Sequence, residues 1–181
     1  MKMKQLTAVV FLSMAILVFW SNRVSAFTLR DAGDVGQFIP TTVALTLIAD
    51  KKDIEGLKQL GLSSGSGAAV AYGLKYGLNI KRPNGHNYSM PSGHAWFAFN
   101  GAEFIRKRYG WKWGVPMYAV SAMVGYSRVE AGVHRPQDVV VAAAIPLVSN
   151  YFFTDAFEKY HFSVTPLVDT HSAGIALDVR W

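Results

Sequence analysis

The chain has 181 residues, which is enough for one domain with a sizeable core and too few for two ordinary domains. Apolar residues make up 51% of it, charged residues 17%, and there is no cysteine. This composition excludes a disulfide framework, a thiolate nucleophile and a zinc site built on cysteine.

The first 26 residues have the pattern of a secretory signal peptide. Lys2 and Lys4 form a basic start, a mainly apolar run covers 6–20, and small or branched residues precede a cleavage site after Ala26. The run is shorter than the roughly 20 residues that cross a bilayer, so cleavage is favoured over an uncleaved anchor. Both interpretations predict an exported protein, in the periplasm or at the periplasmic face of a bacterial membrane.

The net charge depends strongly on this first segment. It carries Lys2, Lys4 and Arg23 and no acid, so the net charge falls from +6 to +3 without it. Several of the remaining basic residues belong to the motifs described below. We therefore expect no nucleic-acid partner.

Residues 27–160 are expected to form a helical domain. Its first half predicts helices at 38–49, 51–62 and 68–80, with a flexible break rich in serine and glycine at 63–67. Its second half predicts helices at 91–108, 115–126 and 136–157, separated by turns at 109–115 and 127–135. Within the last helix, 139–153 is apolar on every face, so it lies at the centre of the bundle or touches lipid.

The last residues, 161–181, change character. Segments 161–168 and 175–181 alternate apolar and polar residues, which predicts a β-hairpin. An isolated hairpin is marginally stable, so it is expected to pack on the bundle or to pair with another chain. The predicted fold class is all-α, a compact helical bundle with a small C-terminal β-hairpin.

Three short segments hold polar residues that a plain helical bundle has no reason to keep. The first pairs Lys75 with Arg82-Pro83, the second is Pro91-Ser92-Gly93-His94, and the third combines Ser127-Arg128 with His134 and Asp138.

Three cations in these segments, Lys75, Arg82 and Arg128, stand beside apolar helices, where an unpaired charge is costly. A shared anionic ligand explains all three, because arginine binds phosphate oxygens in pairs and lysine acts as a point charge. Ser92 and Gly93 at a predicted helix start offer backbone N–H groups and a hydroxyl to the same anion.

The histidines supply the chemistry. His134 and Asp138 are four residues apart at a helix start, so their side chains can meet. A carboxylate that accepts the Nδ1–H leaves Nε2 free to attack phosphorus. His94, at another helix start, is suited to protonate the leaving alkoxide and then to activate water. With three cations to neutralise the phosphoryl oxygens, we expect neither a metal nor a cofactor.

The arrangement resembles the type 2 phosphatidic acid phosphatase and vanadium haloperoxidase superfamily, whose three motifs are matched in order from Lys75 to Asp138. The resemblance implies a helical-bundle fold, with His134 as nucleophile, Asp138 as its partner and His94 as general acid. It implies phosphate ligands at the other motif positions, which are Lys75, Arg82, Ser92, Gly93 and Arg128.

We therefore expect a metal-independent phosphatase that hydrolyses phosphate or pyrophosphate esters through a phosphohistidine on His134. Phosphorylated lipids are the favoured substrates, with the membrane surface as a partner, because apolar helices flank the motifs. A soluble, broad-specificity periplasmic acid phosphatase is the main alternative. A vanadate-dependent haloperoxidase and a non-enzymatic envelope protein are remote ones. Protein partners and the oligomeric state stay open.

Other conspicuous residues have simpler interpretations. His86 is expected to be an exposed surface histidine, although it lies close in sequence to the motifs. Trp96, Phe97 and Phe99 are expected to be core residues, with a lipid-chain pocket as the alternative.

Overall fold

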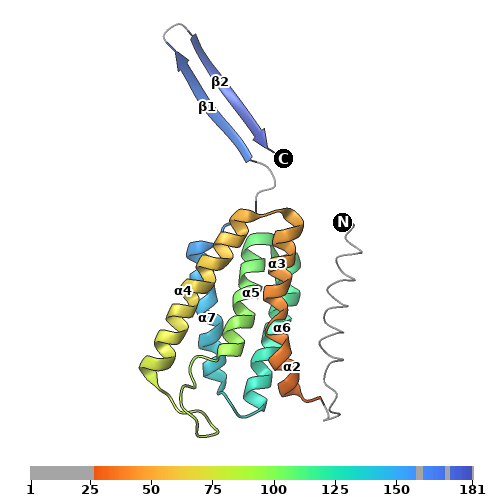
Figure 1. Cartoon of the computed structure of the whole chain (residues 1–181), viewed down its shortest axis with the longest axis vertical. Helices are drawn as coiled ribbons and strands as arrows, with labels where there is room; N and C mark the ends of the chain where they lie inside the picture. The colour runs from red at the N-terminus through yellow and green to blue at the C-terminus, as the bar shows by residue number, and fades with distance from the viewer. Residues whose placement is uncertain (1–26, 158–160, 170–171, 181) are drawn as a thin grey trace.

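The computed structural model describes residues 27–157, 161–169 and 172–180 (Figure 1). The predicted signal peptide, 1–26, lies outside these residues. The described helices are α2 (Leu29–Gly36), α3 (Ile39–Lys51), α4 (Ile54–Leu78), α5 (Gly93–Tyr109), α6 (Trp111–Glu130) and α7 (Pro136–Phe153). The strands are β1 (His161–Asp169) and β2 (Ser172–Arg180), which pair antiparallel with His161 opposite Arg180. The division of the chain at residue 160 stays a prediction.

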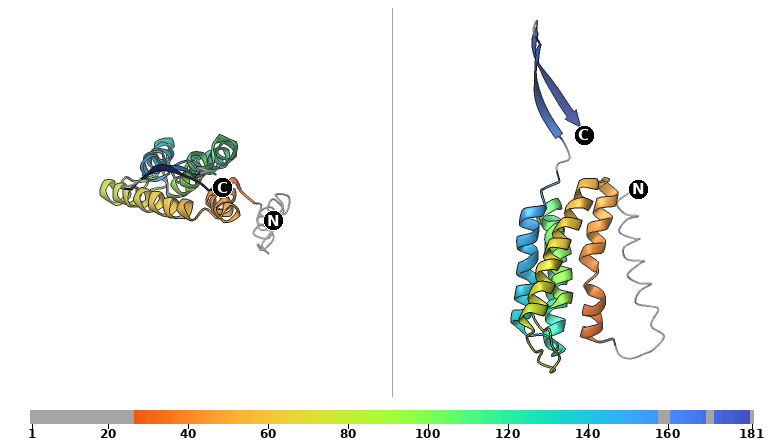
Figure 2. Two further views of the ribbon diagram at one scale, coloured as in Figure 1. Left: turned by 90° about the horizontal axis from the view of Figure 1, so that it is seen from above. Right: turned by 60° about the vertical axis from the view of Figure 1, so that its left-hand side comes forward.

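The helices lie side by side in a bundle, and α5 is its central member (Figures 1 and 2). It packs against α3, α4, α6 and α7, and its buried residues include both small ones and large apolar ones. Ala95, Ala98 and Ala102 are fully buried where neighbouring helices approach, and Phe104 and Ile105 are fully buried in the core shared with α3.

The break predicted at 63–67 is wrong, because α4 runs through it without interruption. The hydroxyls of Ser63 and Ser66 donate to backbone carbonyls of their own helix, those of Leu60 and Ser63. A side chain at Gly67 would come within 3.1 Å of the Ser149 hydroxyl and 3.3 Å of the Trp96 indole nitrogen. Small residues here allow α5 and α7 to pack closely against α4, and this packing overrides their weak helix propensity.

Other helix boundaries also differ from the prediction. The turn expected at 109–115 is confined to Gly110, whose φ of 89° suits glycine. The last helix ends at Phe153 and not at 157, because Arg108 binds the chain that follows. Its guanidinium donates to the carbonyls of Asp155 and Ala156, and its own carbonyl accepts from the N–H of Phe157.

Helix α2 was not predicted. A capping box starts it, in which the Thr28 hydroxyl accepts from the Asp31 N–H and the Asp31 carboxylate accepts from the Thr28 N–H. Helix α2 packs on α6, and Gly33 allows the close approach, because a larger side chain at this position would collide with Ser127 and Arg128. Among the described residues, one helical stretch, Leu29–Lys51, is long and apolar enough to cross a membrane, with a mean hydropathy of 1.2.

Candidate active site

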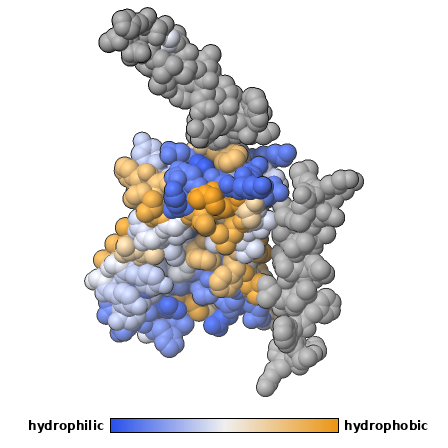
Figure 3. Space-filling view, turned by 45° about the horizontal axis from the view of Figure 1, so that its top comes forward, coloured by the Kyte–Doolittle hydropathy of each residue, from blue (hydrophilic) through white to orange (hydrophobic). Residues whose placement is uncertain are grey.

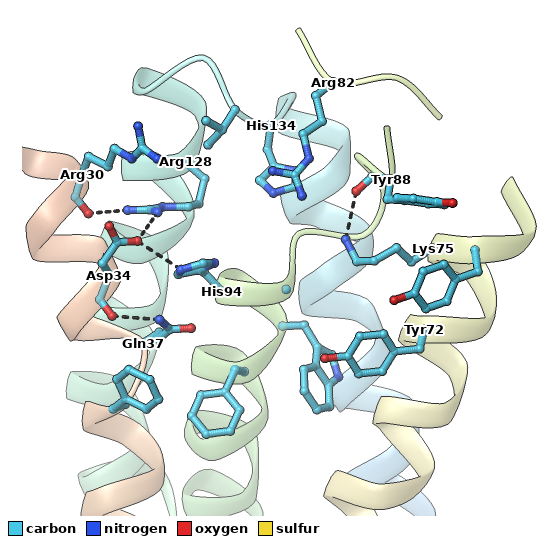
Figure 4. Close-up of a pocket in the computed structure, with 16 residues that line it drawn as sticks. Arg30, Asp34, Gln37, Tyr72, Lys75, Arg82, Tyr88, His94, Arg128 and His134 are labelled. Atoms are coloured by element: carbon cyan, nitrogen blue, oxygen red, sulfur yellow. Dashed lines mark hydrogen bonds and ion pairs between the residues drawn. The ribbon is translucent and has the colours of Figure 1, made fainter. Parts of the chain in front are cut away.

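A cavity of about 560 Å³ opens at the end of the bundle where α4 finishes and α5 and α7 begin (Figure 4). Six of the eight predicted site residues line it, from α4, α5, α6 and the loops that precede α5 and α7. The other two, Ser92 and Asp138, are buried at the starts of α5 and α7. The six lining residues are Lys75, Arg82, Gly93, His94, Arg128 and His134.

The starts of α5 and α7 are fastened to each other. The N–H of Ser92, the N-cap of α5, donates to the backbone carbonyl of Asp138 in the first turn of α7 at 3.1 Å. This bond joins the second motif to the third, so the two helix starts bring His94 and His134 to the same cavity.

The imidazole of His134 is buried, and its Nδ1 lies 3.5 Å from Oδ2 of Asp138. At this distance Nδ1 has no hydrogen-bond partner among the described residues. Burial, followed by the charges of Arg82 and Lys75, lowers the pKa of His134 to about 4 against the opposing effect of Asp138. The imidazole is therefore neutral near pH 7, as a nitrogen nucleophile must be.

The Asp138 carboxylate is itself held in place. Its Oδ2 accepts the Ser89 hydroxyl at 2.5 Å and the Arg135 N–H at 2.8 Å. Ser89 is fully buried and belongs to none of the three motifs, so it was not predicted as a site residue. No signal within the sequence singles it out, since its partner is 49 positions away.

A second carboxylate, that of Asp34 on α2, lies in the cavity and was also missed (Figure 4). Its Oδ1 is 3.1 Å from Nε2 of His94 and accepts from Nη1 of Arg128 at 2.6 Å. Arg30, Asp34 and Gln37 all line the cavity, and their spacing of four and three residues is that of one helix face. The spacing of these polar residues is the sequence feature from which Asp34 could have been predicted as a site residue.

Burial is also the largest influence on His94. Burial and the nearby Arg128 lower its pKa, whereas Asp34 raises it. Asp34 therefore favours the protonated form of His94, which is the form that a general acid needs.

The cations differ in how they are held. Arg128 is buried and bonded to Asp34 and to the carbonyl of Arg30. Lys75 donates to the carbonyls of Tyr88 and Pro91, which ties the loop before α5 to α4. Burial, with the charge of Arg82, lowers the pKa of Lys75.

Several buried polar atoms around this cavity have no hydrogen-bond partner among the described residues. They include Nε of Arg82 and the hydroxyl of Ser92, besides Nδ1 of His134. Buried donors are normally bonded, so this concentration of free ones indicates a place for a polar ligand. In the described part of the chain no three His, Asp or Glu side chains gather as a metal site needs.

The family model of the PAP2 superfamily matches residues 69–161, which contain all three motifs. A lipid A 4'-phosphatase of Helicobacter pylori is 32% identical over 161 residues, which are 82% of this chain and 81% of the relative. The chain belongs to the PAP2 superfamily. A lipid A 1-phosphatase of Helicobacter pylori is 25% identical over 130 residues, which are 65% of this chain and 67% of the relative.

Two solved structures share the PAP2 fold. LpxE of Aquifex aeolicus has a TM-score of 0.59 at 24% identity, over 68% of this chain and 81% of its own. A transmembrane PAP2-type phosphatidylglycerolphosphate phosphatase of Bacillus subtilis has a TM-score of 0.55 at 18% identity, over 84% of this chain and 85% of its own. The expected helical-bundle fold is confirmed, and the family makes the protein a phosphoric ester hydrolase.

Asp34→Asn tests the unexpected carboxylate. We expect kcat to fall about tenfold, the scale of losing an orienting partner. We also expect the basic limb of the kcat/KM profile to move to lower pH. Asp34 raises the pKa of His94, so without its charge His94 loses the catalytic proton at a lower pH. The measurement is the pH dependence of phosphate release.

Glu130→Gln is the matched control, because it removes a carboxylate from an exposed position at the same end of the bundle. Its profile should overlay that of the wild type. A basic limb that stays in place or moves to higher pH in Asp34→Asn would show that Asp34 does not act on His94.

Proposed function

We propose that the protein removes phosphate from a phosphorylated lipid through a phosphohistidine on His134, without a metal ion. The observation that carries this proposal is that one cavity is lined by His94, His134 and the three predicted cations, Lys75, Arg82 and Arg128. Neutral His134, free donors on Arg82 and Ser92, and a carboxylate behind each histidine match what phosphoryl transfer requires.

In the first step the phosphate group lies among Arg82, Arg128 and Lys75, which neutralise its oxygens. Nε2 of His134 attacks phosphorus and forms the P–N bond, while the P–O bond to the lipid breaks. Asp138 accepts the Nδ1–H and stabilises the positive charge that develops on the ring. Protonated His94 gives its proton to the leaving alkoxide.

In the second step water enters where the alkoxide left. Neutral His94 takes a proton from this water, whose oxygen attacks phosphorus. The P–N bond breaks, its electron pair returns to Nε2 of His134, and inorganic phosphate leaves. His94 ends protonated, so both histidines are restored for the next cycle.

The lipid preference is supported by the relatives and by the surface. The two curated relatives are named as lipid A phosphatases, so a lipid A phosphate is the first candidate substrate. Hydrophilic side chains gather toward the ends of the bundle, and apolar ones are frequent between them (Figure 3). On α7, the helix predicted to be apolar on every face, Val140 and Val148 are at least 60% exposed. Exposed apolar side chains on this helix support the proposed contact with lipid.

The position of α2 supports an active site on the periplasmic side. The basic start of the predicted signal peptide, with Lys2 and Lys4, stays on the cytoplasmic side of the membrane, and the chain from residue 27 onward is translocated to the periplasmic side. Helix α2 begins two residues later, and its Arg30 and Asp34 line the cavity. The cavity then faces the side to which residue 27 is exported.

Phosphate release in EDTA tests this function. We expect the purified protein to hydrolyse lipid A and phosphatidic acid in detergent at the same rate with and without EDTA, and faster than a small aryl phosphate. Quenching with base should trap a phosphohistidine, because P–N bonds survive base. Loss of activity in EDTA that Mg²⁺ restores would contradict the metal-free mechanism. A faster rate on the aryl phosphate would favour the broad-specificity acid phosphatase.

A further inference from the structure

One wall of the cavity consists of three tyrosines, and the mechanism uses none of them. Tyr72 and Tyr76 lie one turn apart on α4, with their rings stacked at 6.2 Å between centroids. The ring of Tyr88, from the loop before α5, meets Tyr76 edge to face at 5.1 Å. Tyr72 is 53% exposed, Tyr76 61% and Tyr88 38%. We call them the tyrosine wall.

The tyrosine wall is built next to the phosphate-binding cations. Lys75 precedes Tyr76 on α4 and donates to the backbone carbonyl of Tyr88 at 3.0 Å (Figure 4). Tyr88 has a φ of 63°, a left-handed conformation that is unusual for a bulky residue. The bond from Lys75 fastens the loop to α4 at this residue. The same lysine therefore reaches the phosphate cavity and fastens the aromatic ring beside it.

The cavity is larger than a phosphate group requires. Its volume of about 560 Å³ falls in the range of roughly 300–1,000 Å³ found for pockets that hold drug-sized ligands. The space next to the phosphate must therefore receive the part of the substrate that carries the phosphate, and the tyrosine wall is what that part meets.

The chemistry of the wall favours a sugar ring over an acyl chain. Phenol rings offer flat apolar faces with a hydroxyl at the edge, so they suit a partner that is apolar on its face and polar at its rim. A pyranose ring has this character, with C–H bonds on its face and hydroxyls around its rim. An acyl chain has no groups for the hydroxyls of Tyr72 and Tyr76 to bind.

We propose that the tyrosine wall is a sugar-binding subsite, which stacks on the pyranose ring that bears the phosphate. The enzyme then prefers lipids whose phosphate is carried by a sugar over lipids whose phosphate is carried by glycerol. This inference rests on the proposed lipid phosphatase function.

Tyr76→Leu is the decisive variant, because Tyr76 contacts both other rings and leucine keeps apolar area without a flat face. The measurement is kcat/KM for lipid A, a sugar-borne phosphate, divided by kcat/KM for phosphatidic acid, a glycerol-borne one. We expect this ratio to fall about fivefold, the scale of one aromatic stacking contact. Tyr76→Phe, which keeps the ring, should restore most of the preference.

Tyr126→Leu is the matched control, since Tyr126 is an equally exposed tyrosine at 63% that does not line the cavity. An unchanged ratio in Tyr76→Leu would overturn the subsite, whether the two rates stay the same or fall together. If both rates stay the same, the tyrosines contact the membrane surface and not the substrate. If both rates fall together, the tyrosines support the fold of the site. Failure of the wild type on both lipids would instead overturn the proposed function.

Discussion

His134→Ala is expected to lower kcat for phosphate release by at least about 10⁴-fold, the usual scale for loss of a catalytic nucleophile. The buried imidazole is neutral, because its pKa is lowered to about 4, and it shares the cavity with the three cations proposed to bind phosphate. No other described histidine lies beside a buried carboxylate in this cavity. The phosphohistidine trapped from the wild type should be absent in the variant. The measurements are steady-state phosphate release and base-quenched labelling.

His86→Ala is the control, because His86 is exposed, as the sequence predicted, and does not line the cavity. It should keep full activity. Thermal unfolding of both variants shows whether the bundle is intact. A folded His134→Ala protein that releases phosphate at a rate near that of the wild type would eliminate the phosphohistidine mechanism.

Asp138→Asn is expected to lower kcat by about 10³- to 10⁴-fold, which is the scale seen when a catalytic histidine loses the carboxylate that orients it. The amide has no charge to stabilise the imidazolium that forms when His134 attacks. Its oxygen can still accept from Ser89 and from the Arg135 N–H, so the fold should survive. Asp138 is also a group that raises the pKa of His134, so the variant pKa falls below about 4. No change of pH within the usual range should therefore restore the rate.

Single-turnover kinetics separate this effect from a binding defect. In Asp138→Asn the phosphohistidine should form slowly, while the KM changes little. Asp50→Asn, at an exposed position at the far end of α3, is the control for loss of a carboxylate. If the phosphohistidine forms at the wild-type rate in Asp138→Asn, Asp138 does not assist the attack of His134.

The helical bundle was predictable because apolar periodicity and proline positions act within single helices. The break predicted in α4 was wrong for a reason that lies outside α4. Gly67 is a poor helix former in isolation, yet the close approach of Trp96 and Ser149 leaves little room for a side chain there. Likewise, the end of α7 depends on Arg108, which is 47 positions before the carbonyl it binds at Asp155.

The sequence by itself determined the reaction class, because the spacing of each motif is local. His134 directly precedes Arg135, the N-cap of α7, and Asp138 lies in the first turn of α7, so the pair meets within one helix start. The start of α5 likewise presents Ser92 and His94. Only the tertiary structure decided what surrounds them. Asp34 reaches Arg128 across 94 positions and Ser89 reaches Asp138 across 49, contacts that depend on which helices pack together. The residues proposed to carry the chemistry can therefore be predicted from the sequence, whereas packing sets the residues that lie against them and shape the cavity.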